Sequence, residues 1–247
     1  MTSVVVLLAL LIGASLGFVG GGGAILTVPT LVHAGGFAPR DAIVASLIIV
    51  GVAATAGALL HWRLGTLDAA VAGWFGGLGA LGAMVGARLG HLVPTAWLMA
   101  AFGVIAVAAG LTLMSRYGLV VKPAAQSHPS LVVSTALGVG FLTGLLGVGG
   151  GFIIVPALAL VLRLPMARAV GTSLAVIAMN CAAGLTTAAV ALDADRMIVT
   201  GVFATLALTG TLIGAHSASR ARPDVLRRLF GLLVVGVGVY TGAVALI

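Results

Sequence analysis

The stretch "LGFVGGGGAILTVPTLV", residues 16–32, places four consecutive glycines, Gly20–Gly23, inside an apolar run that extends over residues 3–34. Each glycine in a helix interior costs about 1 kcal/mol relative to alanine. A membrane span needs about 20 residues of helix, so this run is too long for one simple span. We therefore expect a membrane helix that breaks at the glycines and resumes over residues 24–32.

The composition of the whole chain indicates an integral membrane protein. Of its 247 residues, 61% are hydrophobic and 7% are charged, whereas soluble domains carry about 25% charged residues. The net charge of +7 comes from basic residues that stand singly or in pairs between apolar runs. That pattern favours anchoring of cytoplasmic loops over nucleic-acid binding. The single cysteine, Cys181, excludes an internal disulfide and a cysteine-rich metal site.

Eight apolar runs divide into two halves around one polar stretch. We expect a first transmembrane repeat over residues 1–115, a polar linker over 116–129 and a second repeat over 130–247. The linker contains the only lysine, Lys122. The apolar runs cover residues 3–34, 42–60, 67–87, 96–115, 130–162, 169–192, 197–215 and 229–247.

The two halves carry the same motif in a shared register. The segment "GASLGFVGGGGAILTVPTLV" from Gly13 aligns with "GFLTGLLGVGGGFIIVPALAL" from Gly140 at an offset of 127 residues (140 minus 13). Further on, "GAMVGAR" at Gly82 matches "GTLIGAH" at Gly210 at an offset of 128 (210 minus 82). This register indicates an internal duplication, which is typical of secondary transporters. The first offset pairs Gly13 with Gly140, Gly17 with Gly144, Gly20 with Gly147, Gly22 with Gly149, Gly23 with Gly150, Pro29 with Pro156 and Ser46 with Ser173.

A glycine break inside the membrane predicts a binding site. Lipid tolerates irregular backbone only where protein buries it or where it lines a wet cavity. The helix that restarts after each break presents free N–H groups and the positive end of its dipole. Such a terminus binds anions without lysine or arginine. The alternative is that the glycines only allow close helix packing, as small residues do throughout membrane bundles.

These residues resemble a known family. The elements "GFVGGGGAILTVPTLV" with "AIVASL", and "GLLGVGGGFIIVPALAL" with "AVGTSLAVIAMN", are similar to the two motif regions of the sulfite exporter TauE/SafE family. The resemblance implies an inner-membrane transporter of anions such as sulfite, thiosulfate or sulfonates. Two positions depart from symmetry, because the first half has Ala45 and Ala53 where the second has Thr172 and Asn180. A site built on these polar groups would be asymmetric.

The expected substrate contacts combine both glycine clusters with polar residues of the following spans. We expect the two prolines, Pro29 and Pro156, to act as structural hinges. For Ser46 the alternative is a hydrogen bond to its own helix backbone. The expected substrate-binding residues are Gly20, Gly21, Gly22, Gly23, Ser46, Gly147, Gly149, Gly150, Gly151, Thr172, Ser173 and Asn180.

Enzyme functions find little support in the sequence. The glycine runs lack the Lys-Ser/Thr that follows in a nucleotide-binding loop, and no metal-binding or catalytic motif is present. We therefore expect no cofactor and no metal. The expected partners are a small anionic substrate, the lipid bilayer and, as an option that the sequence leaves open, a coupling ion, either a proton or sodium. The chain has no glutamate and no acidic residue in the middle of a span, which argues against ion coupling through membrane carboxylates and leaves His61, His33 or backbone sites for that role. The alternatives to a transporter are an anion channel and a membrane packing or scaffold protein.

The basic residues bear on topology. Counting each broken helix as two segments gives about five segments per repeat, and an odd number inverts the second repeat. In this count Arg40, Arg88 and Arg196 lie on one side of the membrane and all other basic residues lie on the other. This division is more unequal than the one that eight simple spans give. By the positive-inside rule we expect inverted repeats in the inner membrane, with both termini outside. The sequence thus predicts an all-α integral membrane protein of two homologous repeats, each with four to five segments and a glycine-broken first helix.

Overall fold

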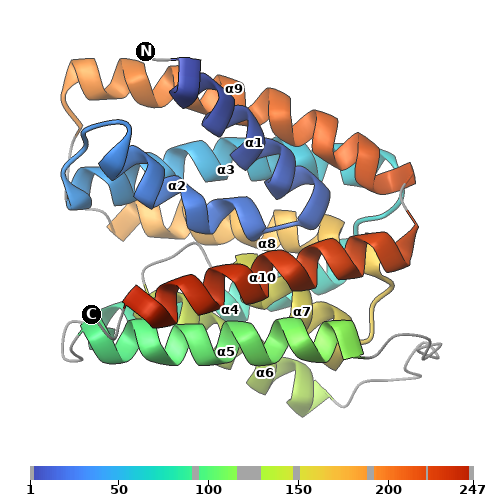
Figure 1. The fold of residues 1–247 in the computed structure, drawn as a ribbon. Helices are drawn as coiled ribbons and strands as arrows, with labels where there is room; N and C mark the ends of the chain where they lie inside the picture. Colours follow the sequence, from blue (N-terminus) through green and yellow to red (C-terminus); the bar gives the residue numbers. More distant parts are fainter. Residues whose placement is uncertain are drawn as a thin grey trace.

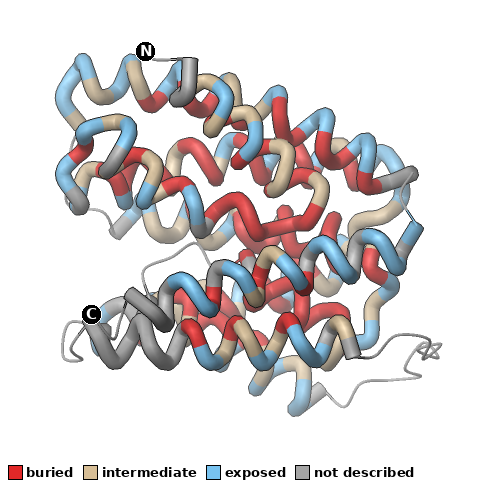
Figure 2. The backbone as a smooth tube through the Cα atoms, in the orientation of Figure 1, coloured by how far each residue is buried: buried red, intermediate tan, exposed pale blue. Residues whose placement is uncertain are grey.

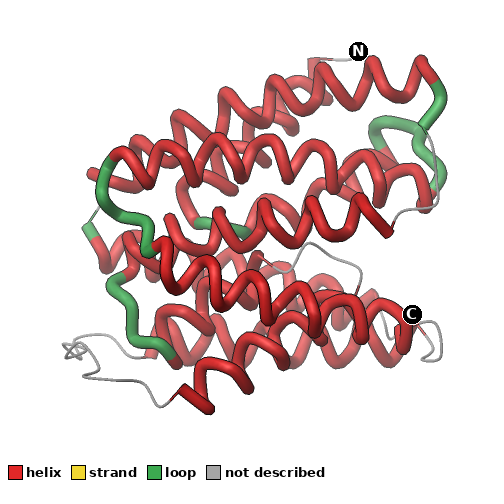
Figure 3. The backbone as a smooth tube through the Cα atoms, turned by 180° about the vertical axis from the view of Figure 1, so that it is seen from behind, coloured by secondary structure: helices red, strands yellow, loops and turns green. Residues whose placement is uncertain are grey.

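The computed structural model describes residues 3–90, 95–115, 129–146, 151–187, 192–220 and 222–244. Within these ranges every regular element is a helix (Figure 3). Residues 116–128, which make up most of the predicted linker, lie outside the described residues. The helices are α1 (Ser3–Val19), α2 (Gly22–His33), α3 (Pro39–Arg63), α4 (Ala69–Gly90), α5 (Thr95–Ser115), α6 (Pro129–Leu146), α7 (Gly151–Pro156), the π-helix η1 (Ala157–Val161), α8 (Met166–Thr187), α9 (Ala194–Arg220) and α10 (Pro223–Val244).

The all-helical membrane architecture predicted from composition is confirmed. Among the described residues, four helices are long and apolar enough to cross a membrane, and they belong to α3, α4, α8 and α9. The helices run roughly along one direction and pack side by side (Figure 1). Large apolar side chains remain exposed on the outside, including Trp74 at 72% and Val104 at 70%. A lipid solvent accounts for such exposure, because lipid tails are as apolar as these side chains.

The expected interruption of the first helix is present, but it is shorter than predicted. Helix α1 ends at Val19 and α2 begins at Gly22. Only Gly20 and Gly21 form the break, and Gly20 has a φ of 76°, which disfavours every residue except glycine. The prediction that the helix resumes at residue 24 was wrong by two residues, because Gly22 and Gly23 already lie in the first turn of α2.

In the second half, helix α7 begins at Gly151. Helix α7 continues to Pro156, where the backbone changes to the π-helix η1. Proline in a helix removes one backbone hydrogen bond, and a π-helical turn accommodates such a defect. The residues between α6 and α7, including Gly147, Gly149 and Gly150, lie outside the described residues.

Two helix pairs pack through glycine, and their contacts match at the offsets found in the sequence. In the parallel pair α1–α9, an added Cβ on Gly13 would overlap the backbone of Ala207. In the parallel pair α4–α6, a Cβ on Gly140 would overlap the backbone of Gly79. Gly140 is the counterpart of Gly13 at the offset of 127, and Ala207 is the counterpart of Gly79 at the offset of 128. The two contacts are therefore equivalent. Backbone therefore approaches backbone at both places, as small residues in membrane helices allow.

Two further pairs are antiparallel. Helices α3 and α8 meet at Gly57 against Leu174 and again at Leu47 against Gly184. Helices α5 and α10 lie side by side and run in opposite directions (Figure 1). Their contacts include Gly110 with Gly231 and Gly103 with Gly238. In each pair, the two contacts are related by the sequence offset. Replacing both residues of the first contact with their counterparts in the other half gives the second contact.

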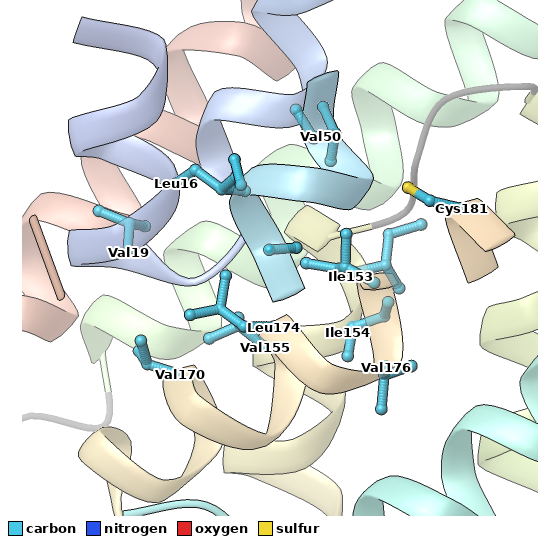
Figure 4. Close-up of a cluster of buried hydrophobic side chains, with 14 of the residues drawn as sticks. Leu16, Val19, Val50, Ile153, Ile154, Val155, Val170, Leu174, Val176 and Cys181 are labelled. Atoms are coloured by element: carbon cyan, nitrogen blue, oxygen red, sulfur yellow. The ribbon is translucent and has the colours of Figure 1, made fainter. Parts of the chain in front are cut away.

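The buried core lies between these pairs and surrounds the first break. Buried residues gather on the inward faces of the helices (Figure 2). Figure 4 shows the centre of this core, where apolar side chains from α1, α3, α7 and α8 point toward one another. The labelled residues are Leu16, Val19, Val50, Ile153, Ile154, Val155, Val170, Leu174, Val176 and Cys181. Cys181 is 1% exposed, in keeping with a packing role.

Candidate substrate site

Gly21 of the first glycine cluster meets Gly151 of the second. A Cβ on Gly21 would overlap the carbonyl group of Gly151, and a Cβ on Gly151 would lie 2.6 Å from the Gly21 Cα. The start of α2 therefore lies directly against the start of α7. We call this place the glycine junction and define it by Gly20, Gly21, Gly151 and Ser173. All four residues are buried.

Ser173 on α8 holds the first break in place. Its Oγ lies 2.6 Å from the Gly20 carbonyl oxygen and 2.7 Å from the Val170 carbonyl oxygen. One hydroxyl has one hydrogen, so the two carbonyls compete for it. A Cβ on Gly20 would lie 2.7 Å from Ser173 Oγ and 2.9 Å from Val170 Cα. Glycine is thus required at position 20 both for its φ angle and for the close approach of α8.

The N-terminus of α2 has no side-chain cap. Gly21 is the N-cap residue and forms no capping hydrogen bond through a side chain. The Ala24 N–H reaches the Gly21 carbonyl oxygen at 3.3 Å, a long bond for this geometry. Gly22 and Gly23 are buried: a Cβ on Gly22 would meet only the Leu233 side chain, whereas one on Gly23 would overlap the Ile12 carbonyl oxygen. The first-turn N–H groups thus form the positive end of a helix dipole inside the protein.

Ser46 and Thr172, two of the sequence-predicted residues, use their hydroxyls elsewhere. Ser46 Oγ donates to the carbonyl oxygen of Ile43 in its own helix at 2.8 Å, which is the alternative that the sequence left open. Thr172 Oγ1 accepts the N–H of Asp68 at 3.1 Å. The structure does not bring these two residues to the glycine junction. Thr172 instead ties α8 to the start of α4.

Asn180 lies on the same face of α8 as Ser173. Seven residues separate them, which is two helical turns and about 10 Å along the axis. Ile177 stands between them, and its Cδ1 would lie 2.7 Å from a Cβ on Gly151. The Asn180 Oδ1 is buried and has no hydrogen-bond partner among the described residues. An unsatisfied buried amide of this kind calls for a ligand or another partner.

The two prolines lie inside helical segments. Pro29 falls within α2 and Pro156 ends α7 at the transition to η1. Their expected hinge role stays a prediction. Among the described residues, no group of three or more His, Cys, Asp or Glu side chains could hold a metal ion.

Sequence reasoning missed the burial of His61. Trp62 is 65% exposed and Arg63 is also exposed, as interface anchors are. His61 differs from them, because it is only 1% exposed. Its Nδ1 lies 2.7 Å from the Oγ1 of Thr66. The pattern of a histidine followed five residues later by threonine, across a helix end, is the only signal that the sequence offers.

Comparison with known proteins identifies the chain's relatives. The sequence profile described as "Sulfite exporter TauE/SafE" matches residues 5–241. The chain belongs to the sulfite exporter TauE/SafE family. The family resemblance that the glycine motifs carry is thereby confirmed, and membership indicates membrane transport.

Proteins from two bacteria are similar to the chain. A "Probable membrane transporter protein" of Xylella fastidiosa (strain Temecula1 / ATCC 700964) is 34% identical over 247 residues, which cover 93% of this chain and 90% of the relative. The "Probable membrane transporter protein YdhB" of Bacillus subtilis (strain 168) is 28% identical over 180 residues, covering 70% of this chain and 73% of the relative. No solved structure gives a significant match.

Proposed function

We propose that the protein is a secondary transporter that exports small sulfur-containing or organic anions, such as sulfite, thiosulfate or sulfonates, across the inner membrane. The observation that carries this proposal is the contact of Gly21 with Gly151. It brings together the starts of two helices that begin inside apolar segments. Two positive dipole ends that converge in a medium of low polarity favour a bound anion.

The N-terminus of α2 is the principal anion ligand in this proposal. Its first-turn N–H groups have no side-chain cap, and an oxyanion would supply the missing acceptors. Asn180 contributes a carboxamide on the neighbouring face of α8. Exchange of its oxygen and nitrogen by a flip would turn the NH2 group, a donor, toward the place where Oδ1 has no described partner. Ser173 positions Gly20 rather than contacting the anion.

We further propose that the two halves are inverted repeats. Support comes from the contacts that match at the sequence offset in α1–α9 and α4–α6, and from the antiparallel pairs α3–α8 and α5–α10. Corresponding helices that pack antiparallel require a two-fold axis perpendicular to them. Such an axis lies in the membrane plane, as in other transporters with inverted repeats.

The ion pair between Asp41 and Arg196 supports the same topology. It joins the start of α3 to the start of α9, so Arg40 and Arg196 lie at one end of the bundle. Ten segments place these two arginines on one side of the membrane, whereas eight simple spans separate them. With both termini outside, the inside-negative potential favours anion export by about 2.3 kcal/mol per charge per 100 mV.

Anion-induced stabilisation of the purified protein tests the site. A ligand that binds only the folded state stabilises it by about 2.7 kcal/mol at a concentration of 100 times Kd. The melting temperature would be measured in detergent with thiosulfate, sulfite, sulfoacetate, sulfate and simple carboxylates. We expect at least one sulfur oxyanion to raise it.

Substitutions at Gly22 make this test specific, because a Cβ there meets only the flexible end of Leu233. Gly22→Asp places a carboxylate at the uncapped N-terminus, where it competes with the anion. We expect Gly22→Asp to abolish the anion-induced shift and Gly22→Ala to keep it, with Gly22→Asn as the uncharged match. A shift that persists in folded Gly22→Asp would exclude the α2 terminus. No shift of the wild type with any anion would overturn the proposed substrate class.

A further inference from the structure

His61 is a buried side chain with one ring nitrogen unsatisfied. It ends α3 next to exposed residues, yet it is itself 1% exposed. The Nε2 atom is buried and has no hydrogen-bond partner among the residues that the structure describes. Buried polar atoms in native structures almost always have partners. The described residues therefore leave Nε2 available for a bound species.

Thr66 determines which ring nitrogen can accept a proton. The Thr66 hydroxyl donates to the His61 carbonyl oxygen at 3.3 Å. Its Oγ1 also lies 2.7 Å from Nδ1 of His61. We assign the tautomer in which Nδ1–H donates to this oxygen, since a hydroxyl that donates to the carbonyl has no second hydrogen for the ring. In this arrangement the neutral imidazole carries its lone pair on Nε2. That atom can take up a proton without breaking the bond to Thr66.

One turn of α8 connects His61 with the glycine junction. A Cβ on Gly171 would lie 2.9 Å from both Cβ and Cγ of His61. Two residues later, Ser173 is hydrogen-bonded to the Gly20 carbonyl oxygen at 2.6 Å. Backbone packed this closely transmits small displacements. A charge on His61 and an anion at the glycine junction would thus act on the same turn.

We propose that His61 is the proton-binding residue of this transporter, and that Nε2 is protonated when the anion occupies the glycine junction. The proposal rests on the function proposed above and names its coupling ion. A proton from water binds the Nε2 lone pair, travels with the anion and is released to water on the other side. Each bound species strengthens the binding of the other by the same factor. One proton with a dianion leaves one net negative charge, which the membrane potential still drives outward.

Other charged groups surround this end of α3. The loop and the start of α4 contribute Asp68, whose Oδ1 accepts the Val71 N–H at 3.0 Å. Helix α8 contributes Arg168, one turn before Gly171, and α9 contributes the exposed His216. Arg63 is the cation on α3 itself, α1 carries no titratable side chain, and His33 of α2 precedes the opposite end of α3. None of these charged side chains bonds Nε2 of His61 in the described part of the chain.

Proton movement in liposomes tests the proposal. The full chain would be reconstituted with a pH-sensitive dye inside, and thiosulfate or sulfoacetate would be added outside. Both anions stay fully ionised near neutral pH, so the dye reports protons carried by the protein. We expect the wild type to move protons with either anion. His61→Gln should lose at least nine-tenths of the proton flux and keep anion exchange between loaded vesicles, whereas His216→Gln should keep both.

The outcomes separate the two proposals. A wild type that carries neither anion overturns the proposed function and this inference with it. A wild type that carries anion without protons, or a folded His61→Gln that still moves protons, overturns only the role of His61. Should His61→Gln fail to fold, Thr66→Val keeps the imidazole and removes its partner. We expect Thr66→Val to shift the pH profile of anion exchange, and an unchanged profile would contradict the proposal.

Discussion

Helices α3 and α8 occupy matching places in the two halves, but they differ in chemistry. Each packs against the other in an antiparallel arrangement, with Gly57 against Leu174 and Leu47 against Gly184. The polar residues of α8 nevertheless correspond in the sequence to alanines of α3, since Thr172 matches Ala45 and Asn180 matches Ala53 at the offset of 127. The difference teaches that the matching glycine contacts, which we call the frame, recur in both halves of the chain, whereas the polar residues of the proposed site lie in α8 alone.

The largest effect is expected from breaking the frame at the glycine junction. In Gly21→Val the side chain would overlap the Gly151 carbonyl group, so the two helix starts must separate. A displacement of about 1 Å at a working site can cost about 100-fold in rate. We expect anion transport in liposomes to fall by about that factor. Gly22→Ala is the matched control and should retain transport; equal rates for both variants would contradict a functional junction.

The next effect tests whether the frame is symmetric. Gly13→Val and Gly140→Val each drive a side chain into the backbone of the partner helix, at Ala207 and Gly79 respectively. Overpacking of this kind costs about 1–3 kcal/mol. We expect both variants to lower the melting temperature in detergent by similar amounts. A large drop for one and none for the other would count against matched helix pairs.

The glycine contacts of this frame could be predicted from the sequence because the glycines recur at a constant offset in the two halves. The pairing of Gly13 with Gly140 is visible in the printed residues, and the same residues make the backbone contacts. The break at Gly20 could be predicted for the same reason, since only glycine adopts its φ angle without strain. The glycine contacts and the break at Gly20 both depend on backbone conformation, and a short sequence motif is enough to specify it.

The use of polar side chains could not be predicted in the same way. In a membrane helix the lipid-facing side is as apolar as the buried side, so periodicity does not show which face points inward. The sequence therefore could not tell that Ser46 bonds its own helix, that Thr172 binds Asp68, or that His61 is buried beside exposed Trp62. The Thr172 bond and the burial of His61 depend on residues far away in the chain, Asp68 and Gly171, whereas for Ser46 the sequence left two uses of the hydroxyl open.

A third prediction concerns the chemistry of α8 alone. Asn180→Leu keeps the number and branching of the side-chain heavy atoms and removes the carboxamide that lacks a described partner at Oδ1. A hydrogen bond to a charged group contributes about 1.5–3 kcal/mol, so we expect the KM for the transported anion to rise at least about 10-fold. The reciprocal variant, Ala53→Asn on α3, should leave the KM nearly unchanged. An unaltered KM in Asn180→Leu would remove this residue from the site.

The smallest effect compares two serines at matching positions. Ser46 and Ser173 each donate to the carbonyl three residues earlier, Ile43 and Val170. Among the described residues, Ser173 also bonds the Gly20 carbonyl oxygen in the first half. Hydrogen bonds between membrane helices contribute about 0.6 kcal/mol on average. We expect Ser173→Ala to lower the free energy of unfolding by about that amount and Ser46→Ala by less, as measured by unfolding in mixed micelles.

The comparison of the two serines also separates stability from function. Because Ser173 holds the residue that begins the break, its loss should let Gly20 and the start of α2 move away from α7. Ser173→Ala is therefore expected to weaken anion-induced stabilisation more than its small effect on unfolding would require. If Ser46→Ala weakened anion binding as much as Ser173→Ala does, the anion site would have to draw on both halves equally, and the one-sided chemistry inferred for α8 would be wrong.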